Sequence, residues 1–318
     1  MPHRSGLALV ACVVLSACGG TVANPSPAGP ASAAASKPDA SSLTPIKVSY
    51  SQPTAGFAHL WMAADKGYFR KYGLDAQVLQ ITPPADAQAV LNGETQFDFD
   101  GSAGVSAISS GAAMPFIAVT NPTYTQAFYG QQSIQKVSDV IGKTVAATTR
   151  SGSSDFALRA LLAREGVDAN KVNITYLRDD SAILAALQGG SVQAAVLTSP
   201  NTLRARAAGL RLIEDMATSR WHTVNQGLNV RKDWAQQHED LVLAFLKGEL
   251  EGLRDAKTDP QATKQTITKW TQVTDAVLLD EAYRTGNAGW VANPLAHDED
   301  LQSIIDMSTE ANVKGHKP

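Results

Sequence analysis

One segment of four small residues has the composition of an anion-binding turn: Ser151, Gly152, Ser153 and Ser154. It opens the strongest helical pattern of the chain, residues 153–165, which carries Asp155 in its first turn. A helix N-terminus presents free backbone N–H groups and a partial positive charge, and glycine lets a ligand approach the backbone closely. We expect Ser153 to cap this helix and the segment to bind an anion. A helix cap without a ligand is the alternative.

Cys18 is the other residue whose setting predicts chemistry. It follows Leu-Ser-Ala at residues 15–17, after an apolar run over residues 7–15 that Arg4 precedes. This pattern predicts a secretory signal over residues 1–17, with an apolar run too short for a permanent membrane span. It resembles the lipobox of bacterial lipoproteins, which implies cleavage before Cys18 and acylation of its thiol. An ordinary signal peptide that contains a cysteine is the alternative.

Residues 18–45 are predicted to form a flexible tether behind the lipid. Beyond Cys18 the segment is mostly Ala, Ser, Pro and Gly, with one Lys and one Asp. Such a stretch cannot bury enough apolar surface to offset the entropy lost on ordering. Periodic sequence begins at Ile46, so we expect the fold to begin there.

Composition excludes several functions. Removing the signal removes Arg4 and no acidic residue, so the net charge changes from −3 to −4. A weakly acidic chain without a run of basic residues argues against nucleic-acid binding. Cys12 and Cys18 are the only cysteines, so the globular part has neither a disulfide nor a thiolate site. The motifs His-Glu-x-x-His, Walker A and Gly-x-Ser-x-Gly are absent, and the six histidines are scattered. We therefore expect no catalytic residue, metal or cofactor.

Short apolar runs alternate with helical patterns after Ile46. Strands are expected at residues 46–50, 74–81, 97–100, 116–120, 143–147, 172–177 and 194–197. Helices are expected at residues 57–64, 85–91, 153–165, 182–187, 241–253, 261–270 and 301–307. This alternation predicts an α/β fold with a largely parallel sheet, as one large domain or two lobes.

Two segments of the chain match each other. Residues 91–102 align without gaps on residues 187–198, each with a helix end, a glycine turn and a strand that finishes at a hydroxyl residue. The match suggests two lobes of like topology. Ligands of open α/β sheets sit beyond the carboxyl ends of strands, so Ser102 and Thr198 would face each other across a cleft. A chance similarity of two common helix–strand units is the alternative.

A resemblance to a known family extends from about residue 46 to residue 290. Residues 55–75, with Lys-Gly-Tyr-Phe and then Gly-Leu, resemble the opening signature of solute-binding proteins of ABC importers, of the nitrate, sulfonate, taurine and thiamine-pyrimidine-precursor type. Segments similar to later elements of that family follow in order at residues 91–98, 142–146, 151–154, 227–232 and 239–246.

The resemblance implies a two-lobed periplasmic-binding-protein clam. Lobe I would comprise residues 46–120 and 228–318, and lobe II residues 121–227. Two crossings, near residues 120–122 and 225–227, would form the hinge, where Pro122 restricts and Gly227 frees the backbone.

Other candidate ligand contacts lie at the predicted turns and crossings. Gln52 and Phe57 lie at the first strand-to-helix turn, Asn121 at the first crossing, and Trp221 and Gln226 before the second. An aromatic side chain such as Trp221 at the cleft would stack on a ring or close over an alkyl chain of the ligand. Buried core positions are the alternative for Phe57 and Trp221.

The function implied by the resemblance is that of an extracytoplasmic receptor, lipid-anchored to the cell membrane. It would deliver a small anionic or heteroaromatic ligand, of the sulfonate, nitrate or pyrimidine-precursor class, to ABC permease subunits. We expect a monomer that does no chemistry on the ligand. The alternative is an extracytoplasmic enzyme or biosynthetic protein that reuses the fold, which a cleft rich in His or carboxylates would favour. A sensor lobe that feeds a signalling partner is a third reading.

Overall fold

The computed structural model describes residues 43–150, 152–219, 221–295 and 297, apart from the side chains of Ser102, Ala103 and Ser219. The predicted signal with Cys18, most of the predicted tether, Ser151 and the helix expected at residues 301–307 lie outside the described residues. Both sheets described below belong to one unit of the chain, Pro38–Pro318.

The first sheet has the strand order β2-β1-β3-β10-β4. Strand β10 runs antiparallel to β3 and β4, whereas β1 is parallel to β2 and β3. Its strands are β1 (Thr44–Tyr50), β2 (Leu74–Gln80), β3 (Phe97–Phe99), β4 (Phe116–Thr123) and β10 (His222–Val230).

The second sheet repeats this plan with the order β7-β6-β8-β5-β9. Strand β5 is antiparallel to β8 and β9, so it takes the place that β10 has in the first sheet. Its strands are β5 (Ala127–Gly130), β6 (Thr144–Ala147), β7 (Asn173–Tyr176), β8 (Ala194–Leu197) and β9 (Arg211–Asp215). The matched segments 91–102 and 187–198 therefore lead into the central strands β3 and β8.

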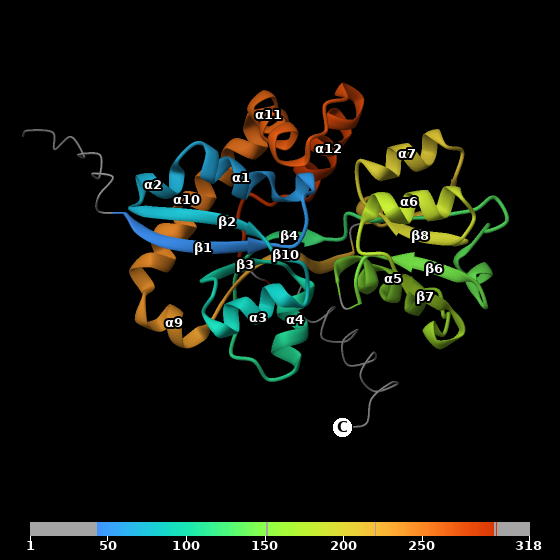
Figure 1. The fold of residues 1–318 in the computed structure, drawn as a ribbon, viewed down its shortest axis with the longest axis horizontal. Coiled ribbons are helices and arrows are strands. Elements are labelled where there is room, and N and C mark those ends of the chain that lie inside the picture. The colour runs from blue at the N-terminus through green and yellow to red at the C-terminus, as the bar shows by residue number, and fades with distance from the viewer. Residues whose placement is uncertain (1–42, 151, 220, 296, 298–318) are drawn as a thin grey trace, which may run out of the picture. The chain divides into compact units, whose positions relative to one another are not determined.

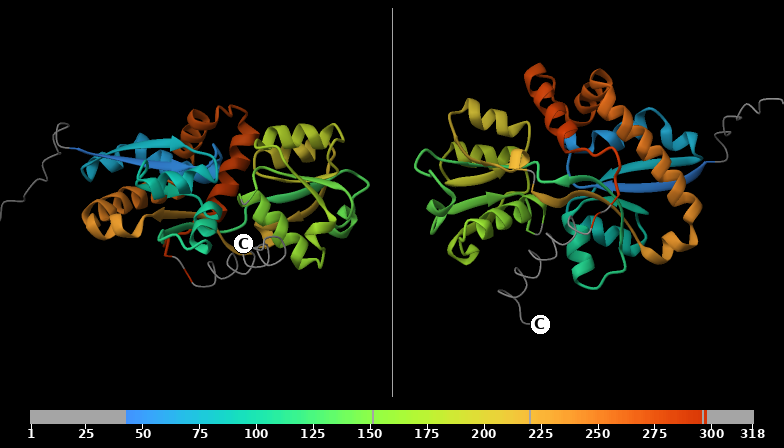
Figure 2. Two further views of the ribbon diagram at one scale, coloured as in Figure 1. Left: turned by 60° about the horizontal axis from the view of Figure 1, so that its bottom comes forward. Right: turned by 180° about the vertical axis from the view of Figure 1, so that it is seen from behind.

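Helices cover both faces of each sheet (Figures 1 and 2). With the first sheet they form the first lobe: α1 (Ala58–Asp65), α2 (Tyr68–Lys71), α3 (Ala85–Asn92), α4 (Ser102–Ser109), α9 (Lys232–Gln237), α10 (Glu239–Thr258), α11 (Pro260–Thr271), α12 (Ala276–Gly289) and the 3₁₀ turn η2 (Ala55–Phe57). With the second sheet they form the second lobe: α5 (Ser153–Arg164), α6 (Asp180–Gln188), α7 (Asn201–Ala207), α8 (Met216–Ser219) and the turns η3 (Val137–Val140) and η4 (Ala169–Lys171).

The larger core cluster lies between the first sheet and helices α1, α2, α10, α11 and α12. Stacked rings dominate it: Phe97 lies 4.1 Å from Phe245, and Trp61 lies 5.4 Å from Trp270 between ring centroids. Burying such side chains contributes about 1.5–3 kcal/mol each. His59 is fully buried in this core, where its Nδ1 forms a hydrogen bond with Glu249.

The two lobes are joined by neighbouring strands. The chain leaves the first sheet after β4 and returns to it through β10, and these strands pair with each other, Asn121 opposite Gln226. The predicted hinge residues therefore lie inside paired strands of the first sheet. Among the described residues, 124–126 connect β4 to β5, and residue 221 directly precedes β10. Residues 291–294 cover the outer edge of β4, because Val119 N donates to Pro294 O and Val291 N donates to Thr120 O.

The α/β fold with two lobes is confirmed, with differences in detail. Each sheet is largely parallel, as predicted, with one exception: β10 in the first sheet and β5 in the second run against the other four strands. Strand β1 begins at Thr44, inside the segment predicted as tether. Strands β5, β9 and β10 were not predicted as strands. Polar residues interrupt the apolar pattern of β9 and β10, and β5 has only four residues, of which the last is a glycine.

Candidate functional site

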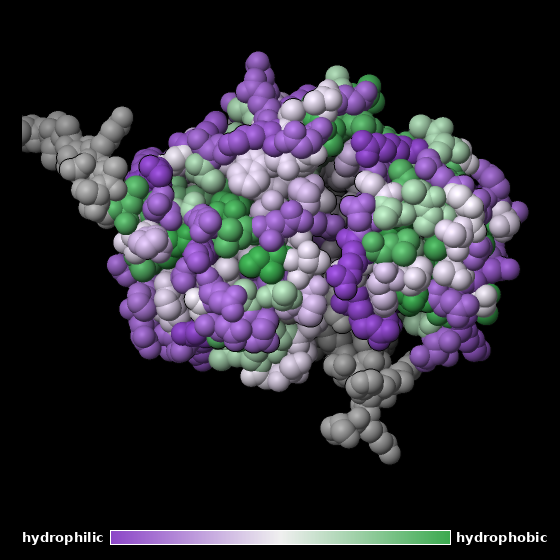
Figure 3. Space-filling model, in the orientation of Figure 1, coloured by the Kyte–Doolittle hydropathy of each residue, from purple (hydrophilic) through white to green (hydrophobic). Residues whose placement is uncertain are grey.

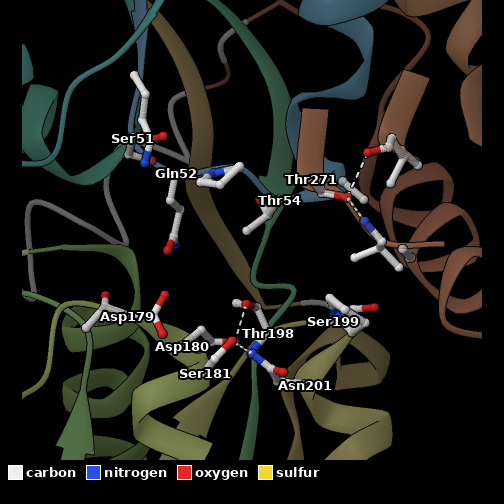
Figure 4. A pocket seen from close by; sticks show the side chains of 18 of the residues that line it. Ser51, Gln52, Thr54, Asp179, Asp180, Ser181, Thr198, Ser199, Asn201 and Thr271 are labelled. Atoms are coloured by element: carbon white, nitrogen blue, oxygen red, sulfur yellow. Dashed lines mark hydrogen bonds between the residues drawn. The ribbon is translucent and has the colours of Figure 1, made fainter. Parts of the chain in front are cut away.

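A cavity of about 470 Å³ lies between the two lobes. Its walls come from the turns after β1, β3, β6 and β8, from the starts of α5, α6 and α7, and from the connection between α11 and α12. Figure 4 shows Ser51, Gln52 and Thr54 of the first lobe facing Asp180, Ser181 and Thr198 of the second lobe across an open gap. Hydrophilic residues also gather where the lobes meet on the face shown in Figure 3.

Neutral polar side chains make up half of the cavity wall, and no aromatic side chain is among the described lining residues. Hydroxyl and amide groups both donate and accept hydrogen bonds, so this wall suits a polar ligand. These neutral polar residues are Ser51, Gln52, Thr54, Gln80, Thr82, Thr148, Thr149, Ser153, Ser181, Thr198, Ser199, Asn201, Thr271, Gln272 and Thr274. The charged residues are Asp100, Arg178, Asp179, Asp180, Arg204 and Asp275.

The start of α5 contributes Gly152 and Ser153 to the cavity. Gly152, not Ser153, is the N-cap, and Ser153 is the first helical residue. A Cβ on Gly152 would lie 2.3 Å from Thr149 Oγ1, so a side chain at this position would have to displace the Thr149 hydroxyl. Ser154 points into the protein, where its Oγ accepts from the backbone N of Thr148 at 2.8 Å. The prediction that Ser153 caps the helix is therefore wrong, and Ser154 is engaged internally.

The start of α6 places Asp180 in the opposite part of the second-lobe wall. Its Oδ2 accepts from Thr198 N at 3.0 Å, from Thr198 Oγ1 at 2.7 Å and from Asn201 Nδ2 at 3.2 Å. Its Oδ1 has no partner. Burial raises the pKa of Asp180 to about 6, and the hydrogen bonds from Thr198 and Asn201 oppose that rise. Asp180 is thus a fixed carboxylate that is ionised at neutral pH, and its Oδ1 is buried without a hydrogen-bond partner.

A smaller cavity of about 40 Å³ continues the cleft toward the paired strands β4 and β10. Asn121, Gln226 and Phe57 line it, together with Ser199, which lines both cavities. Asn121 Nδ2, Gln226 Oε1 and Ser199 Oγ are buried without a hydrogen-bond partner. Glycine backbone makes room for one of these amides, because a Cβ on Gly56 would lie 2.1 Å from Gln226 Nε2.

The connection between α11 and α12 forms a third wall that the sequence did not suggest. Residues 271–275 all line the larger cavity. Gln272 has a φ of +59° and Arg178, on the second-lobe side, a φ of +63°; they are the two non-glycine residues with positive φ in the described ranges. Such conformations cost about 1–3 kcal/mol each and cluster at functional sites. Both of these residues line the larger cavity, and this is the signal that points to the third wall. It can be seen only in the folded chain.

Three carboxyl groups extend from the cleft into the first lobe. Asp100 lines both cavities, whereas Asp86 and Asp98 are fully buried behind it. Burial, followed by the nearby charge of Asp100, raises the pKa of Asp86 to about 8. Burial and then the charges of Asp86 and Asp100 raise the pKa of Asp98 well above its usual value, although Ser49 Oγ donates to Asp98 Oδ1 at 2.7 Å. This array holds protons at neutral pH.

The structure brings most of the predicted site residues together. Gln52, Gly152, Ser153 and Thr198 line the larger cavity, and Phe57, Asn121 and Gln226 line the smaller one. Trp221 lines neither, because its ring packs against Tyr124 and beneath the Arg164 guanidinium, 4.2 Å from its centroid. Ser151 and the side chain of Ser102 lie outside the described part.

Within the described ranges, His, Cys, Asp and Glu side chains form no group of three able to hold a metal ion. No helix among the described residues has both the length and the apolar character that a membrane span requires.

The two lobes, the paired crossing strands and the interlobe cavity define a periplasmic-binding-protein fold. The periplasmic aliphatic sulphonate-binding protein SsuA of Escherichia coli shares this fold, with a TM-score of 0.70 at 18% identity over 84% of this chain and 92% of that one. Residues 54–263 match the NMT1/THI5-like family, and the chain belongs to it.

Binding proteins with named ligands are among the relatives that are similar to this chain in sequence. The taurine-binding periplasmic protein of Escherichia coli is 26% identical over 177 residues, 54% of each chain. The riboflavin-binding protein RibY of Chloroflexus aurantiacus is 24% identical over 253 residues, 74% of this chain and 70% of that one.

Proposed function

We propose that this protein is an extracytoplasmic solute-binding protein that delivers a small polar ligand to an ABC importer. The observation that carries the proposal is the polar cavity of about 470 Å³ whose walls come from both lobes. A ligand that contacts both walls stabilises the arrangement in which the walls are close, so it shifts an opening–closing equilibrium. A permease that recognises the closed arrangement would then receive loaded protein. No catalytic step is needed.

The hinge in this proposal comprises the polar residues that connect β4 to β5 and the facing residues of β10. Gln126 Nε2 donates to Asn225 Oδ1 at 3.3 Å, and Asn225 Nδ2 donates to Thr125 Oγ1 at 3.2 Å. These side-chain bonds link the two crossing segments. They are long and partly solvated, so a change in backbone direction there costs little.

We propose that an acceptor group of the ligand binds at the start of α5. Gly152 and Ser153 line the cavity at a helix N-terminus, where free N–H groups and the helix dipole favour negative charge. The taurine-binding relative and the sulphonate-binding structure are named for ligands that carry such a group. The larger cavity lacks aromatic side chains among its described lining residues, so we favour a non-aromatic ligand over a heteroaromatic one.

A screen by thermal shift tests this function. The chain from residue 19 is incubated with small sulfonates, carboxylates, nitrate and heteroaromatic compounds. A ligand that binds the native state raises the melting temperature, and the rise grows with the logarithm of the ligand concentration divided by Kd. Ser153→Glu places a negative charge at the start of α5 and should weaken binding of an anionic ligand at least tenfold. Ser133→Glu, at an exposed position away from both cavities, is the matched control. No binder in the screen, or equal affinities for both variants, would contradict the proposal.

We also propose that the mature chain is anchored through a lipid on Cys18. The support is the pattern at residues 15–18 after a short apolar run. Cys18→Ser should leave the protein unlipidated, and detergent-phase separation of cell fractions measures this. A variant that still partitions with membranes would rule out the anchor while leaving the binding function in place.

A further inference from the structure

Carboxylates outnumber cationic side chains in the larger cavity. Its described wall holds four aspartates against the guanidinium groups of Arg178 and Arg204. A cleft lined mainly by one sign of charge concentrates ligands of the opposite sign. An anionic ligand alone does not account for this wall.

Two of these aspartates also occupy helix starts that would otherwise attract an anion. Asp179 Oδ1 accepts from Ala182 N at 2.8 Å at the start of α6, and Asp275 Oδ1 accepts from Leu278 N at 2.9 Å at the start of α12. The N-termini of α6 and α12 are therefore already capped by carboxylates of the protein itself. The start of α5 differs from these two, because its N-cap is Gly152 and no described side chain caps it.

Asp180 differs from both because its free oxygen is not committed to a helix. Its Oδ2 accepts from Thr198 and Asn201, which fixes the carboxylate plane, and its Oδ1 has no partner. In the described part of the chain, no cationic side chain lies within 4.0 Å of this carboxylate. Ser199, which is 8% exposed, adds a hydroxyl that is also without a partner on the same wall.

We propose that the ligand carries a positively charged donor group, a primary ammonium or an amidinium, and that Asp180 Oδ1 accepts a hydrogen bond from it. This inference rests on the proposed solute-binding function and deepens it. With an acceptor group at the start of α5, the ligand class becomes a small zwitterion rather than a simple anion. The contact is a charge-assisted hydrogen bond to a carboxylate that is already oriented, so little ordering is needed on binding.

Matched pairs of probes test the proposal in the unmodified protein. Taurine is compared with ethanesulfonate, and β-alanine with propionate, because each pair differs by one amino group. Calorimetry of the chain from residue 19 should show at least tenfold tighter binding for the amino member of a pair. This comparison needs no variant, so it does not depend on whether a substituted chain folds.

Asp180→Asn then assigns the preference to one side chain. The amide keeps an acceptor for Thr198 and removes the charge, so the amino preference should fall below threefold. Asp179→Asn is the matched control, since asparagine caps a helix as well as aspartate and the cleft loses the same charge one residue away. That control should retain the preference.

Each remaining outcome overturns the inference. Equal affinities within the pairs would refute it while leaving the solute-binding function standing. Equal losses in Asp179→Asn and Asp180→Asn would show that the general field of the cleft, not Asp180, selects the ligand. Failure of every probe, in these pairs and in the wider screen, would remove the proposed function as well.

Discussion

The two lobes place an aspartate at the same point of the same topology and accommodate it in different ways. Asp86 lies in the first turn of α3, the helix that leads to the central strand β3, and Asp180 lies in the first turn of α6, which leads to β8. Thr198 and Asn201 donate hydrogen bonds to Asp180. Among the described residues, the backbone N of Ala87 donates to Asp86 Oδ1 and no side chain donates to it, while Asp86 Oδ2 is buried without a partner.

The difference decides which carboxyl group can serve a ligand. Hydrogen bonds keep the pKa of Asp180 at about 6 despite burial, so it is charged at neutral pH. Burial and the neighbouring Asp100 bring the pKa of Asp86 to about 8, so it is neutral there. The second lobe thus retains a charged carboxylate at Asp180, whereas Asp86 of the first lobe stays protonated. The difference arises because Thr198 and Asn201, at the end of β8 and the start of α7, donate hydrogen bonds to Asp180.

The largest expected contrast between the lobes lies in their central strands. Phe97 of β3 stacks on Phe245 at 4.1 Å, whereas β8 has the smaller Val196 in its core. Phe97→Ala should lower the free energy of unfolding by about 3–5 kcal/mol, and Val196→Ala by about 1–3 kcal/mol, since fewer buried atoms are lost. Urea denaturation measures both. Equal losses of unfolding free energy in the two variants would show that the central strands of the two lobes contribute equally to stability.

The next contrast concerns the stored proton. The pKa of Asp86 is about 8 in the folded state, above its ordinary value of 3.8, so between these pH values the folded chain holds a proton that the unfolded chain has lost. Stability therefore falls as pH rises through this window. Asp86→Asn should flatten that fall and be more stable than the parent at pH 9, by on the order of 2 kcal/mol.

Denaturation curves at pH 5, 7 and 9 check this prediction. Asp75→Asn, at an exposed aspartate of the same lobe, serves as control and should keep the parent slope. A pH profile of Asp86→Asn that runs parallel to the parent would show that this carboxyl group does not hold the proton.

A smaller effect is expected from the donor that keeps Asp180 charged. Thr198→Val removes the hydroxyl that donates to Asp180 Oδ2 at 2.7 Å and retains the backbone N–H. The loss of one hydrogen bond to a charged group should cost about 1–2 kcal/mol and raise the pKa of Asp180 further. Combined with Asp180→Asn in a double-mutant cycle, the two changes should be non-additive. Strict additivity would show that the pair does not interact.

The smallest effect should come from Ser153→Ala. Gly152 is the N-cap of α5 and Ser153 makes no capping bond, so stability should change by less than about 0.5 kcal/mol. Ser154→Ala should cost more, because Thr148 N donates to the Ser154 hydroxyl. Thermal melts in the absence of ligand compare the two. A larger loss for Ser153→Ala would restore this residue as the cap.

Sequence reasoning predicts best where burial and periodicity coincide. The internal match at residues 91–102 and 187–198 is a good guide because both segments lead into central strands of equal topology. Strand β10 escapes such reasoning because its polar residues, among them Gln226, are buried at the crossing rather than solvated. An apolar pattern does not reveal a strand in which amide side chains are buried between apolar ones.

The candidate site was predictable only in part for the same reason. Turns that follow strands, such as those at Gln52 and Thr198, are expected at the cleft of any open α/β sheet. The third wall at residues 271–275 depends on how two C-terminal helices pack on the first lobe, which local sequence does not specify. Trp221 shows the opposite error, because an aromatic residue near a crossing packs against its own lobe instead of facing the cleft.

The pairing of β4 with β10 has a consequence for how such proteins diversify. Because departure and return lie side by side, one uninterrupted stretch of gene, from about residue 124 to residue 221, encodes an entire wall of the cleft. Recombination at two neighbouring points would exchange that stretch as a cassette, leaving intact the aromatic core that supports the other wall. We expect the contribution of each wall to ligand preference in this architecture to evolve separately.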